Sequence, residues 1–195
     1  ISTTGTSGYG LFFSSSSDNI AKNNTITTIG LTSVGVHFDS SSNLTVENNI
    51  ITTTGNIIPT LYTSGIHFYE SSNSSAINNT ITTTGNGGYG LSFSSSSDNI
   101  AANNTINTSS GTVDSFYIYS MSLGNLFQNN NIIQSGRDGI RLHSFSGSFP
   151  ENNNFTNNSF LSVTGYDLNI VDAGIDETYL INQPISSYNF AGAGS

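Results

Sequence analysis

The chain of 195 residues contains no cysteine and no tryptophan, and only three of its residues are basic, Lys22, Arg137 and Arg141. Without cysteine it has neither a disulfide framework nor a thiolate for catalysis or metal binding. The formal net charge of −9 repels nucleic acid and anionic membranes, so we exclude both as partners. No apolar run approaches the roughly 20 residues of a membrane span, and the N-terminus lacks a basic-then-apolar signal segment.

Charged residues are scarce, at 8%, and hydrophobic residues make up 34% of the chain. Low hydrophobicity favours disorder when a sequence is aperiodic or strongly charged. Here Ile, Leu, Phe and Val recur at fixed places between Asn, Ser, Thr and Gly. We therefore expect a folded chain of one domain.

A short motif recurs six times along the chain, and its first copy is Asn23-Asn24-Thr25-Ile26-Thr27-Thr28. We use the asparagine two positions before the apolar residue as the marker of each copy. Successive markers are 25, 30, 25, 26 and 28 residues apart. The markers are Asn24, Asn49, Asn79, Asn104, Asn130 and Asn158. A period in the twenties is typical of a solenoid.

Three short segments follow one another within each period. All have period-two apolarity, and Thr and β-branched residues alternate with Gly, Asn and Ser corners, which predicts strands. The inward residue of the first strand is Ile26 and its equivalents, and the second strand usually opens with glycine, as in Gly35-Val36-His37-Phe38. One period is then one rung, and rungs stack in parallel at about 4.8 Å. Stacked marker amides are predicted to form a hydrogen-bonded ladder at one corner.

The repeated pattern consists of an apolar residue, two residues, Asn, one residue and Ile, followed by Gly-Ile-x-Leu/Phe and then Ser-Ser-Asn. It resembles the right-handed parallel β-helix repeat. That repeat occurs in NosD-type and pectate-lyase-like surface and carbohydrate-active proteins, and the resemblance covers roughly residues 8 to 170. It implies an all-β, right-handed, single-stranded parallel β-helix of about seven rungs. We predict repeats over residues 1–170 and a C-terminal partial rung, cap or assembly segment over residues 171–195.

The outward positions of the glycine-opened strands form rows of aromatic, imidazole and charged side chains. Such side chains stack against sugar rings or anchor protein contacts. The candidate glycan or partner face consists of Phe12, His37, Asp39, His67, Tyr69, Glu70, Tyr117, Tyr119, Arg141 and His143. His37 and His67 are expected about 5 Å apart on neighbouring rungs, but they lack a third ligand, so we predict no metal site and no cofactor.

Few residues are suited to catalysis. A lyase needs a carboxylate cluster beside a basic residue, and Arg137, Asp138 and Arg141 provide no such cluster. For a glycosidase the best carboxylate pair is Asp39 with Glu70. We therefore predict no catalytic residues and expect that the protein is not an enzyme.

Two further patterns have candidate roles. Eight sequons give candidate glycosylation sites, although a chain so rich in Asn, Ser and Thr forms about as many by chance. They lie at Asn23, Asn43, Asn73, Asn78, Asn103, Asn107, Asn154 and Asn157. Partly regular Thr-x-Thr rows, such as Thr25/Thr27 and Thr80/Thr82, resemble ice-binding arrays, but threonine is also an ordinary strand residue.

Residues 8–28 match residues 88–108 at 18 of 21 positions, which indicates duplication of a block of three rungs. Copying whole blocks favours an architectural role. We predict an extracellular, non-catalytic structural or adhesive module of a cell-surface or filament protein, which self-associates into a filament or surface layer. The alternative is a carbohydrate-binding or carbohydrate-active β-helix domain, and an ice-binding solenoid ranks below both.

Overall fold

The computed structural model describes residues 1–55, 63–86, 88–144, 147–171, 179–181 and 183–191, and within them it contains 22 strands and no helix. The strands form three sheets, which we call A, B and C, and every strand pair is parallel. Seven, eight and seven strands make up the three sheets, close to the seven rungs that the sequence predicts.

Each of seven rungs contributes one strand to each sheet, in the order A, B, C, and the last strand of the chain adds an eighth strand to sheet B. Sheet A contains β1 (Ser2–Thr4), β4 (Thr25–Ile29), β7 (Ile50–Thr54), β10 (Thr80–Thr84), β13 (Thr105–Thr108), β16 (Asn131–Gln134) and β19 (Ser159–Phe160). Sheet B contains β2 (Ser7–Ser14), β5 (Thr32–Asp39), β8 (Thr63–Tyr69), β11 (Gly88–Ser94), β14 (Phe116–Tyr119), β17 (Ile140–His143), β20 (Leu168–Val171) and β22 (Tyr188–Ala191). Sheet C contains β3 (Ile20–Lys22), β6 (Thr45–Glu47), β9 (Ser75–Ile77), β12 (Ile100–Ala102), β15 (Leu126–Gln128), β18 (Asn154–Thr156) and β21 (Tyr179–Ile181).

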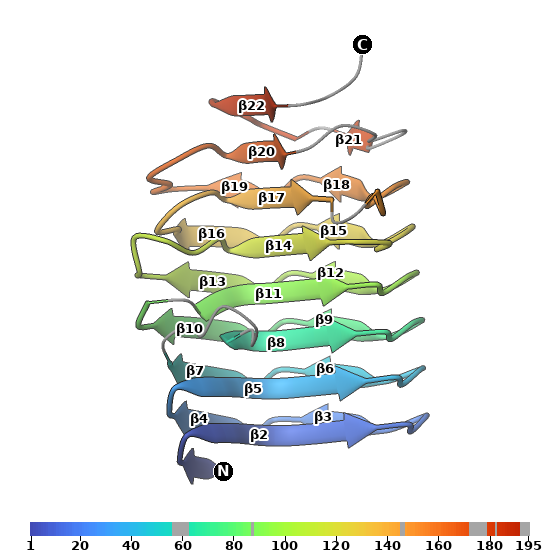
Figure 1. Cartoon of the computed structure of the whole chain (residues 1–195), viewed down its shortest axis with the longest axis vertical. Helices are drawn as coiled ribbons and strands as arrows, with labels where there is room; N and C mark the ends of the chain where they lie inside the picture. Colours follow the sequence, from blue (N-terminus) through green and yellow to red (C-terminus); the bar gives the residue numbers. More distant parts are fainter. Residues whose placement is uncertain (56–62, 87, 145–146, 172–178, 182, 192–195) are drawn as a thin grey trace.

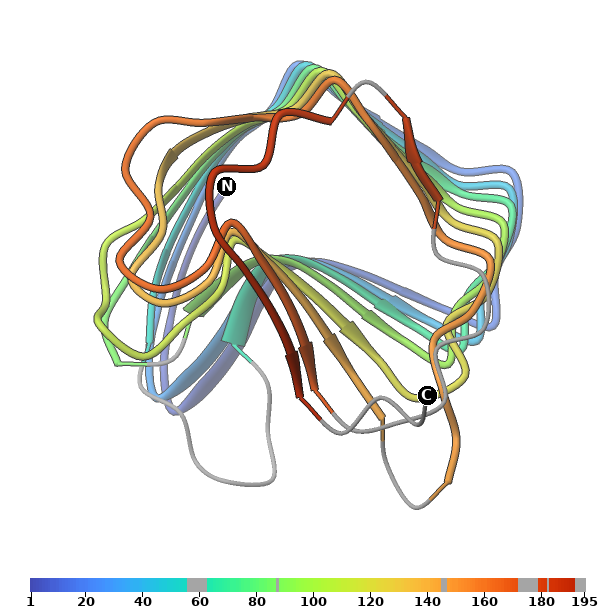
Figure 2. The same cartoon turned by 90° about the horizontal axis from the view of Figure 1, so that it is seen from above.

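The chain rises from the N-terminus at one end of the coil to β20 and β22 at the other (Figure 1). Strands of sheet B run from left to right at the front, and the chain returns along sheets C and A behind them, which makes the coil right-handed. Seen along the axis, the equivalent strands of successive rungs lie over one another around a common centre (Figure 2). The predicted right-handed parallel β-helix is therefore confirmed.

The centre of the coil is filled by columns of identical or similar apolar side chains. Ile26, Ile51 and Ile81 are paired in register in sheet A and are fully buried. A parallel ladder repeats the same pairing at every rung, so a residue that fits its own rung also fits the rung above. Aromatic rings stack in the same way, with centroids 4.8 Å apart for Phe38 and Phe68 and 4.6 Å apart for Phe68 and Phe93.

The large core residue changes sheets halfway along the coil. In the first rungs sheet B supplies phenylalanine, such as Phe93, and sheet C supplies a small residue, such as Ala101. In the later rungs sheet C supplies Phe127, paired in register above Ala101, and at the register position of Phe93 sheet B supplies Ile118. The rings of Phe93 and Phe127 meet edge to face at 5.0 Å, so the exchange keeps the core filled where the pattern switches.

The marker asparagines lie in one column at the corner between sheets C and A. At each rung the backbone N–H and the side-chain Nδ2 donate to Oδ1 of the marker above, as from Asn49 to Asn79 at 3.0 and 3.1 Å. The second Nδ2 hydrogen of Asn79 reaches down to the carbonyl of Val46 at 3.0 Å. The column runs from Asn24 to Asn158 and ends on Gln183, whose Oε1 accepts both bonds from Asn158.

A second asparagine column lies at the corner between sheets B and C. It consists of Asn99, Asn125 and Asn153, with the same pair of bonds from one residue to the next. Beside it the backbone N–H of Ser41 donates to Oγ of Ser71 at 3.2 Å. Both columns satisfy backbone groups that the tight corners remove from the sheets.

The C-terminal strands extend the sheets: β21 pairs with β18, and β22 pairs with β20. The described parts of the predicted segment 171–195 thus join the last rungs, while the division at residue 170 stays a prediction. Within the described ranges, no helix has the length and apolarity needed to cross a membrane.

Candidate functional site

The outer surface of sheet B, which we call the sheet-B face, carries the side chains that the sequence selects. One register column contains Phe12, His37, His67, Ser92, Tyr117, Arg141 and Asn169. A second column, two residues further along each strand, contains Ser14, Asp39, Tyr69, Ser94, Tyr119 and His143. The structure therefore places the candidate residues on one face, with Glu70 directly after Tyr69 at its edge.

Much of the first column is covered, although its side chains point outward. Phe12 is 50% exposed, but His37 is 9% exposed and His67 only 5%. Neighbouring rings provide part of the cover, since Tyr9 and Phe12 stack on His37 with centroids 5.1 and 5.3 Å away. The middle of the column is thus the floor of the face, and the exposed rings stand around it.

Three exposed aromatic rings lie at the N-terminal end of the face. Tyr9 and Phe12 stack on each other with centroids 5.0 Å apart, and they are 42% and 50% exposed. Tyr69 is 38% exposed, and its hydrogen bond to Glu70 is the main cause that raises its pKa. These rings offer flat, partly solvated surfaces, of the kind that stack on a ligand ring.

The two floor histidines are held in their neutral form. Their ring centroids are 4.8 Å apart. Burial lowers the pKa of His37 from 6.5 to about 4, against the opposing charge of Asp39. Burial, and then the charge of His37, lower the pKa of His67 well below 6.5. Neutral, covered imidazoles act here as packed rings, because the low local polarity disfavours their cations.

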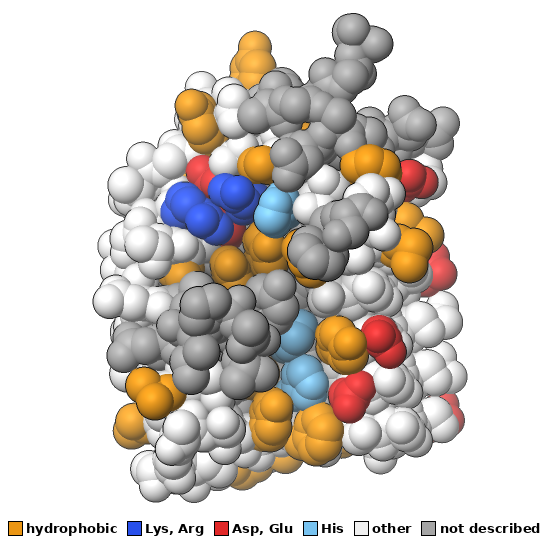
Figure 3. Space-filling view, viewed as in Figure 1, with side chains coloured by type: hydrophobic (Ala, Val, Ile, Leu, Met, Phe, Trp, Pro, Cys, Tyr) orange, Lys and Arg blue, Asp and Glu red, His pale blue; other side chains and the backbone are white. Residues whose placement is uncertain are grey.

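An ionic cluster occupies the other end of the face. Asp114 is fully buried and accepts two bonds from Arg137, at 2.8 Å from Nε and 2.5 Å from Nη2. The hydrogen bond to Asp114 raises the pKa of Arg137. Asp138 accepts from Nδ2 of Asn169 at 2.6 Å and from Nη1 of Arg141 at 3.4 Å. Figure 3 shows the arginine side chains gathered in one patch of the face, beside a histidine.

Aromatic side chains join the ionic cluster to the floor. Tyr89 and Tyr117 are stacked with centroids 4.4 Å apart, and the hydroxyl of Tyr117 lies 2.8 Å from Nδ1 of His143. Tyr119 also packs on Tyr117 and His143, with centroids 5.6 Å away from each. Rings, imidazole and guanidinium therefore follow one another on adjacent rungs of a continuous face.

Sequence reasoning missed three residues of this face: Tyr9, Tyr89 and Asp114. The repeated Gly-Tyr-Gly at residues 8–10 and 88–90 is the signal that marks the two tyrosines. Asp114 has no such signal, because it precedes a strand whose rung lacks the opening glycine. The second asparagine column was also missed, since earlier rungs have Leu44 and Ser74 in place of its asparagine.

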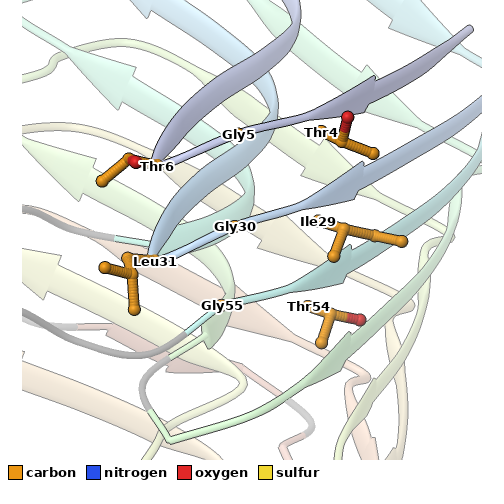
Figure 4. Close-up of a pocket in the computed structure, with 8 residues that line it drawn as sticks. All are labelled: Thr4, Gly5, Thr6, Ile29, Gly30, Leu31, Thr54 and Gly55. Carbon is orange, nitrogen blue, oxygen red and sulfur yellow. The ribbon is translucent and has the colours of Figure 1, made fainter.

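A separate hollow lies at the corner between sheets A and B, close to the N-terminus (Figure 4). It has a volume of about 550 Å³ and is lined by Thr4, Gly5, Thr6, Ile29, Gly30, Leu31, Thr54 and Gly55. Glycine is required at its base, because a Cβ on Gly30 would lie 1.7 Å from the carbonyl oxygen of Gly5. None of these lining residues is ionisable, so the hollow offers shape but no acid, base or metal ligand.

The remaining candidates lie away from the sheet-B face. Among the sequon asparagines, Asn107 and Asn154 are half-buried and the other six are exposed, as is expected of corner residues. The threonine rows lie on the outer side of sheet A, where Thr27, Thr52 and Thr82 are in register. The neighbouring column is interrupted by Ile50, between Thr25 and Thr80.

The comparisons with known proteins agree with this fold. No curated protein sequence matches the chain. The structure titled as a mutant of the periplasmic alginate epimerase AlgG is similar, with a TM-score of 0.55 at 15% sequence identity. The match covers 95% of this chain and 47% of the epimerase chain, so this chain spans about half of that structure. At this identity the likeness concerns the fold alone.

The profile of the family described as "Periplasmic copper-binding protein (NosD)" matches residues 2–106. This match covers 105 of the 195 residues, which is more than half of the chain. It agrees with the predicted resemblance and with the parallel coil, and the chain belongs to the NosD family.

Proposed function

We propose that this chain is an exported β-helix domain that binds carbohydrate along the sheet-B face without acting on it. The observation that carries the proposal is the set of exposed rings at one end of that face, Tyr9, Phe12 and Tyr69, beside a covered floor. Tyrosine and phenylalanine rings combine large apolar area with few rotatable bonds, so they bind sugar faces at low entropic cost. Export is supported by the periplasmic descriptions of the NosD family and of the similar epimerase.

The carboxylates of the face support binding rather than hydrolysis. Asp114 and Asp138, the buried ones, both contact arginine side chains, so neither is placed to exchange a proton with a ligand. Asp39 and Glu70 lie along one edge of the face in neighbouring rungs. A glycosidase needs one carboxyl group on each side of the scissile bond, whereas these two lie along the same edge of the face.

Copper binding, which the family description names, is not extended to this chain. His37 and His67 are neutral, as metal ligands must be. However, the residues that the structure describes contain no group of three or more His, Cys, Asp and Glu side chains placed to hold a metal. The chain also lacks cysteine, whose thiolate copper(I) prefers. These residues do not fit a copper site.

A panel of neutral and acidic oligosaccharides tests the proposal. We expect the purified chain to bind at least one of them, and the variants Phe12→Ala and Tyr69→Ala to bind it about 5 to 10 times more weakly, since each removes one stacking ring. Ile20→Ala is the matched control, because Ile20 is 70% exposed on sheet C. The proposal fails if no oligosaccharide binds, or if the ring variants bind as well as the control. The absence of released reducing ends or unsaturated products would support the non-catalytic part.

A self-assembling structural module is the second candidate. The near-identity of residues 8–28 and 88–108 favours it, since copied rungs build length more readily than they build a new site. Light scattering over a hundredfold range of concentration tests this candidate. A mass that stays at that of one chain would remove it.

A further inference from the structure

The arginines of this acidic protein are concentrated at one place. With a net charge of −9, the chain has only three basic residues. Lys22 lies on sheet C and pairs with Glu47 at 2.9 Å. Both arginines lie at the C-terminal end of the sheet-B face, in the patch visible in Figure 3. Basic residues are thus rare in this molecule, and two of the three lie on the proposed binding face, which calls for a specific role.

The two arginines differ in how fully their hydrogen-bond donors are used. Arg137 makes a two-pronged bond to Asp114, which fixes its guanidinium. Arg141 makes one long bond, 3.4 Å to Oδ2 of Asp138, and that oxygen already accepts the shorter bond from Asn169. A guanidinium has five N–H donors. Among the residues that the structure describes, Asp138 is the sole hydrogen-bond acceptor for Arg141, so most of its five donors lack a partner within that part of the chain.

The surroundings of Arg141 strengthen an interaction with an anion. Its side chain is 18% exposed, so its flanks are covered while part of it reaches the surface. In β17 it lies in register between Tyr117 and Asn169, one rung from the aromatic rings of β14. A partly desolvated guanidinium binds a carboxylate or sulfate more strongly than one in bulk water, and its fork matches two oxygens.

The rest of the face argues against a polyanion. Asp39 and Glu70 are carboxylates at the edge of the N-terminal half. In the cluster, Asp114 and Asp138 balance the charges of Arg137 and Arg141. A ligand charged along its whole length would therefore meet two carboxylates and the repulsion of the net charge of −9.

We propose that the glycan bound on the sheet-B face is mostly neutral and carries one anionic group, a carboxylate or a sulfate ester, which Arg141 holds. The neutral sugar rings stack on Phe12 and Tyr69, and the anionic group lies at the opposite end of the same face. This inference rests on the proposed carbohydrate binding and adds the class of ligand and its direction on the protein. About five rung spacings, roughly 24 Å, separate Phe12 from Arg141 along the coil.

Matched oligosaccharides test the inference. One neutral oligosaccharide that binds is compared with forms bearing a single carboxylate or a single sulfate, and with a polyanionic form, by calorimetry. The natural chain is expected to bind one singly charged form about tenfold more tightly than the neutral form. Arg141→Gln should lose this preference while still binding the neutral form, and Arg141→Lys should retain part of it. Lys22→Gln, which removes a cation from sheet C, is the control and should keep the full preference.

The outcomes separate the two proposals. Equal affinity for the neutral and singly charged forms, or a preference that survives Arg141→Gln, would overturn the inference and leave carbohydrate binding in place. Tightest binding of the polyanion at low salt would also overturn it. Binding of no form at all would refute the proposed function itself. Circular dichroism of Arg141→Gln, matched to the parent, excludes loss of fold as the cause of lost preference.

Discussion

The asparagine column makes Asn79→Ala a sharp test of how the rungs are held together. Asn79 is 1% exposed and takes part in four side-chain bonds. Its Oδ1 accepts from the backbone N–H and from Nδ2 of Asn49, and its Nδ2 donates to the carbonyl of Val46 and to Oδ1 of Asn104. Alanine keeps only the backbone bonds, from its own N–H to Oδ1 of Asn104 and from the N–H of Thr105 to its carbonyl.

The size of the effect follows from the groups that lose their partners. Two donors of Asn49 and the carbonyl of Val46 are left without Asn79, and each unsatisfied buried group costs about 1–3 kcal/mol. The sum over these three groups is about 3–9 kcal/mol, and relaxation of the corner reduces it toward the lower value. We expect the free energy of unfolding to fall by about 3 kcal/mol and the melting temperature by about 6–12 °C.

Urea titration followed by circular dichroism measures this change. The control is Asn131→Ala, because Asn131 is exposed and its side chain accepts one bond, from the hydroxyl of Ser159. We expect the control to stay within about 0.5 kcal/mol of the parent. If Asn79→Ala were as stable as the control, the buried bonds of the column would contribute nothing measurable, and the reasoning would be refuted.

Three further predictions concern the core and the face. The pKa of His37 is about 4 in the folded state and 6.5 in the unfolded state, so as the pH falls the unfolded chain binds a proton at His37 before the folded chain does. The free energy of unfolding is therefore greatest above pH 6.5. It should fall by up to about 3 kcal/mol as the pH drops to 4. Melting curves between pH 7.5 and 4 should show a smaller fall for His37→Phe, and an equal fall would contradict this. Phe127→Ala should lower the free energy of unfolding by about 3–5 kcal/mol, because it empties part of the core. Phe12→Ala, at an exposed ring, should change it by less than about 0.5 kcal/mol. Similar urea midpoints for the two variants would contradict the described core. Gly65→Ala should lower the free energy of unfolding by about 1–3 kcal/mol, because the new Cβ would lie 2.2 Å from Cγ2 of Ile81 and 2.7 Å from the carbonyl oxygen of Gly90. Unchanged stability would show that the backbone shifts there to make room for the methyl group.

The architecture could be predicted from the sequence because every rung needs the same kinds of residue at the same positions. An inward residue such as Ile81 is identical or similar in each copy, so the period, the strand order and the register all follow from one alignment of the chain with itself. The resemblance to NosD-type repeats supplied the handedness. Physical redundancy of this kind is absent from features that occur once.

The details of the face were less accessible for that reason. The pair of Asp114 and Arg137 depends on the local path of one irregular rung, which no repeat encodes. The burial of His67 depends on which neighbouring rings pack against it. A register column predicts the direction of a side chain but not how far its neighbours shield it from solvent. Sequence reasoning therefore placed the residues on one common face and missed which of them reach the solvent.

The exchange of large and small residues between sheets B and C has a consequence for how such a chain changes length. Rungs that share the same filling, with phenylalanine in sheet B as in Phe68 and Phe93, present equivalent upper and lower surfaces, so a copied block can be inserted among them without new contacts. The junction of Ala101 with Phe127 is different, because its lower and upper surfaces have different shapes. Gain or loss of coils should thus be tolerated on either side of this junction and resisted across it, which makes it a fixed point in a fold of otherwise adjustable length.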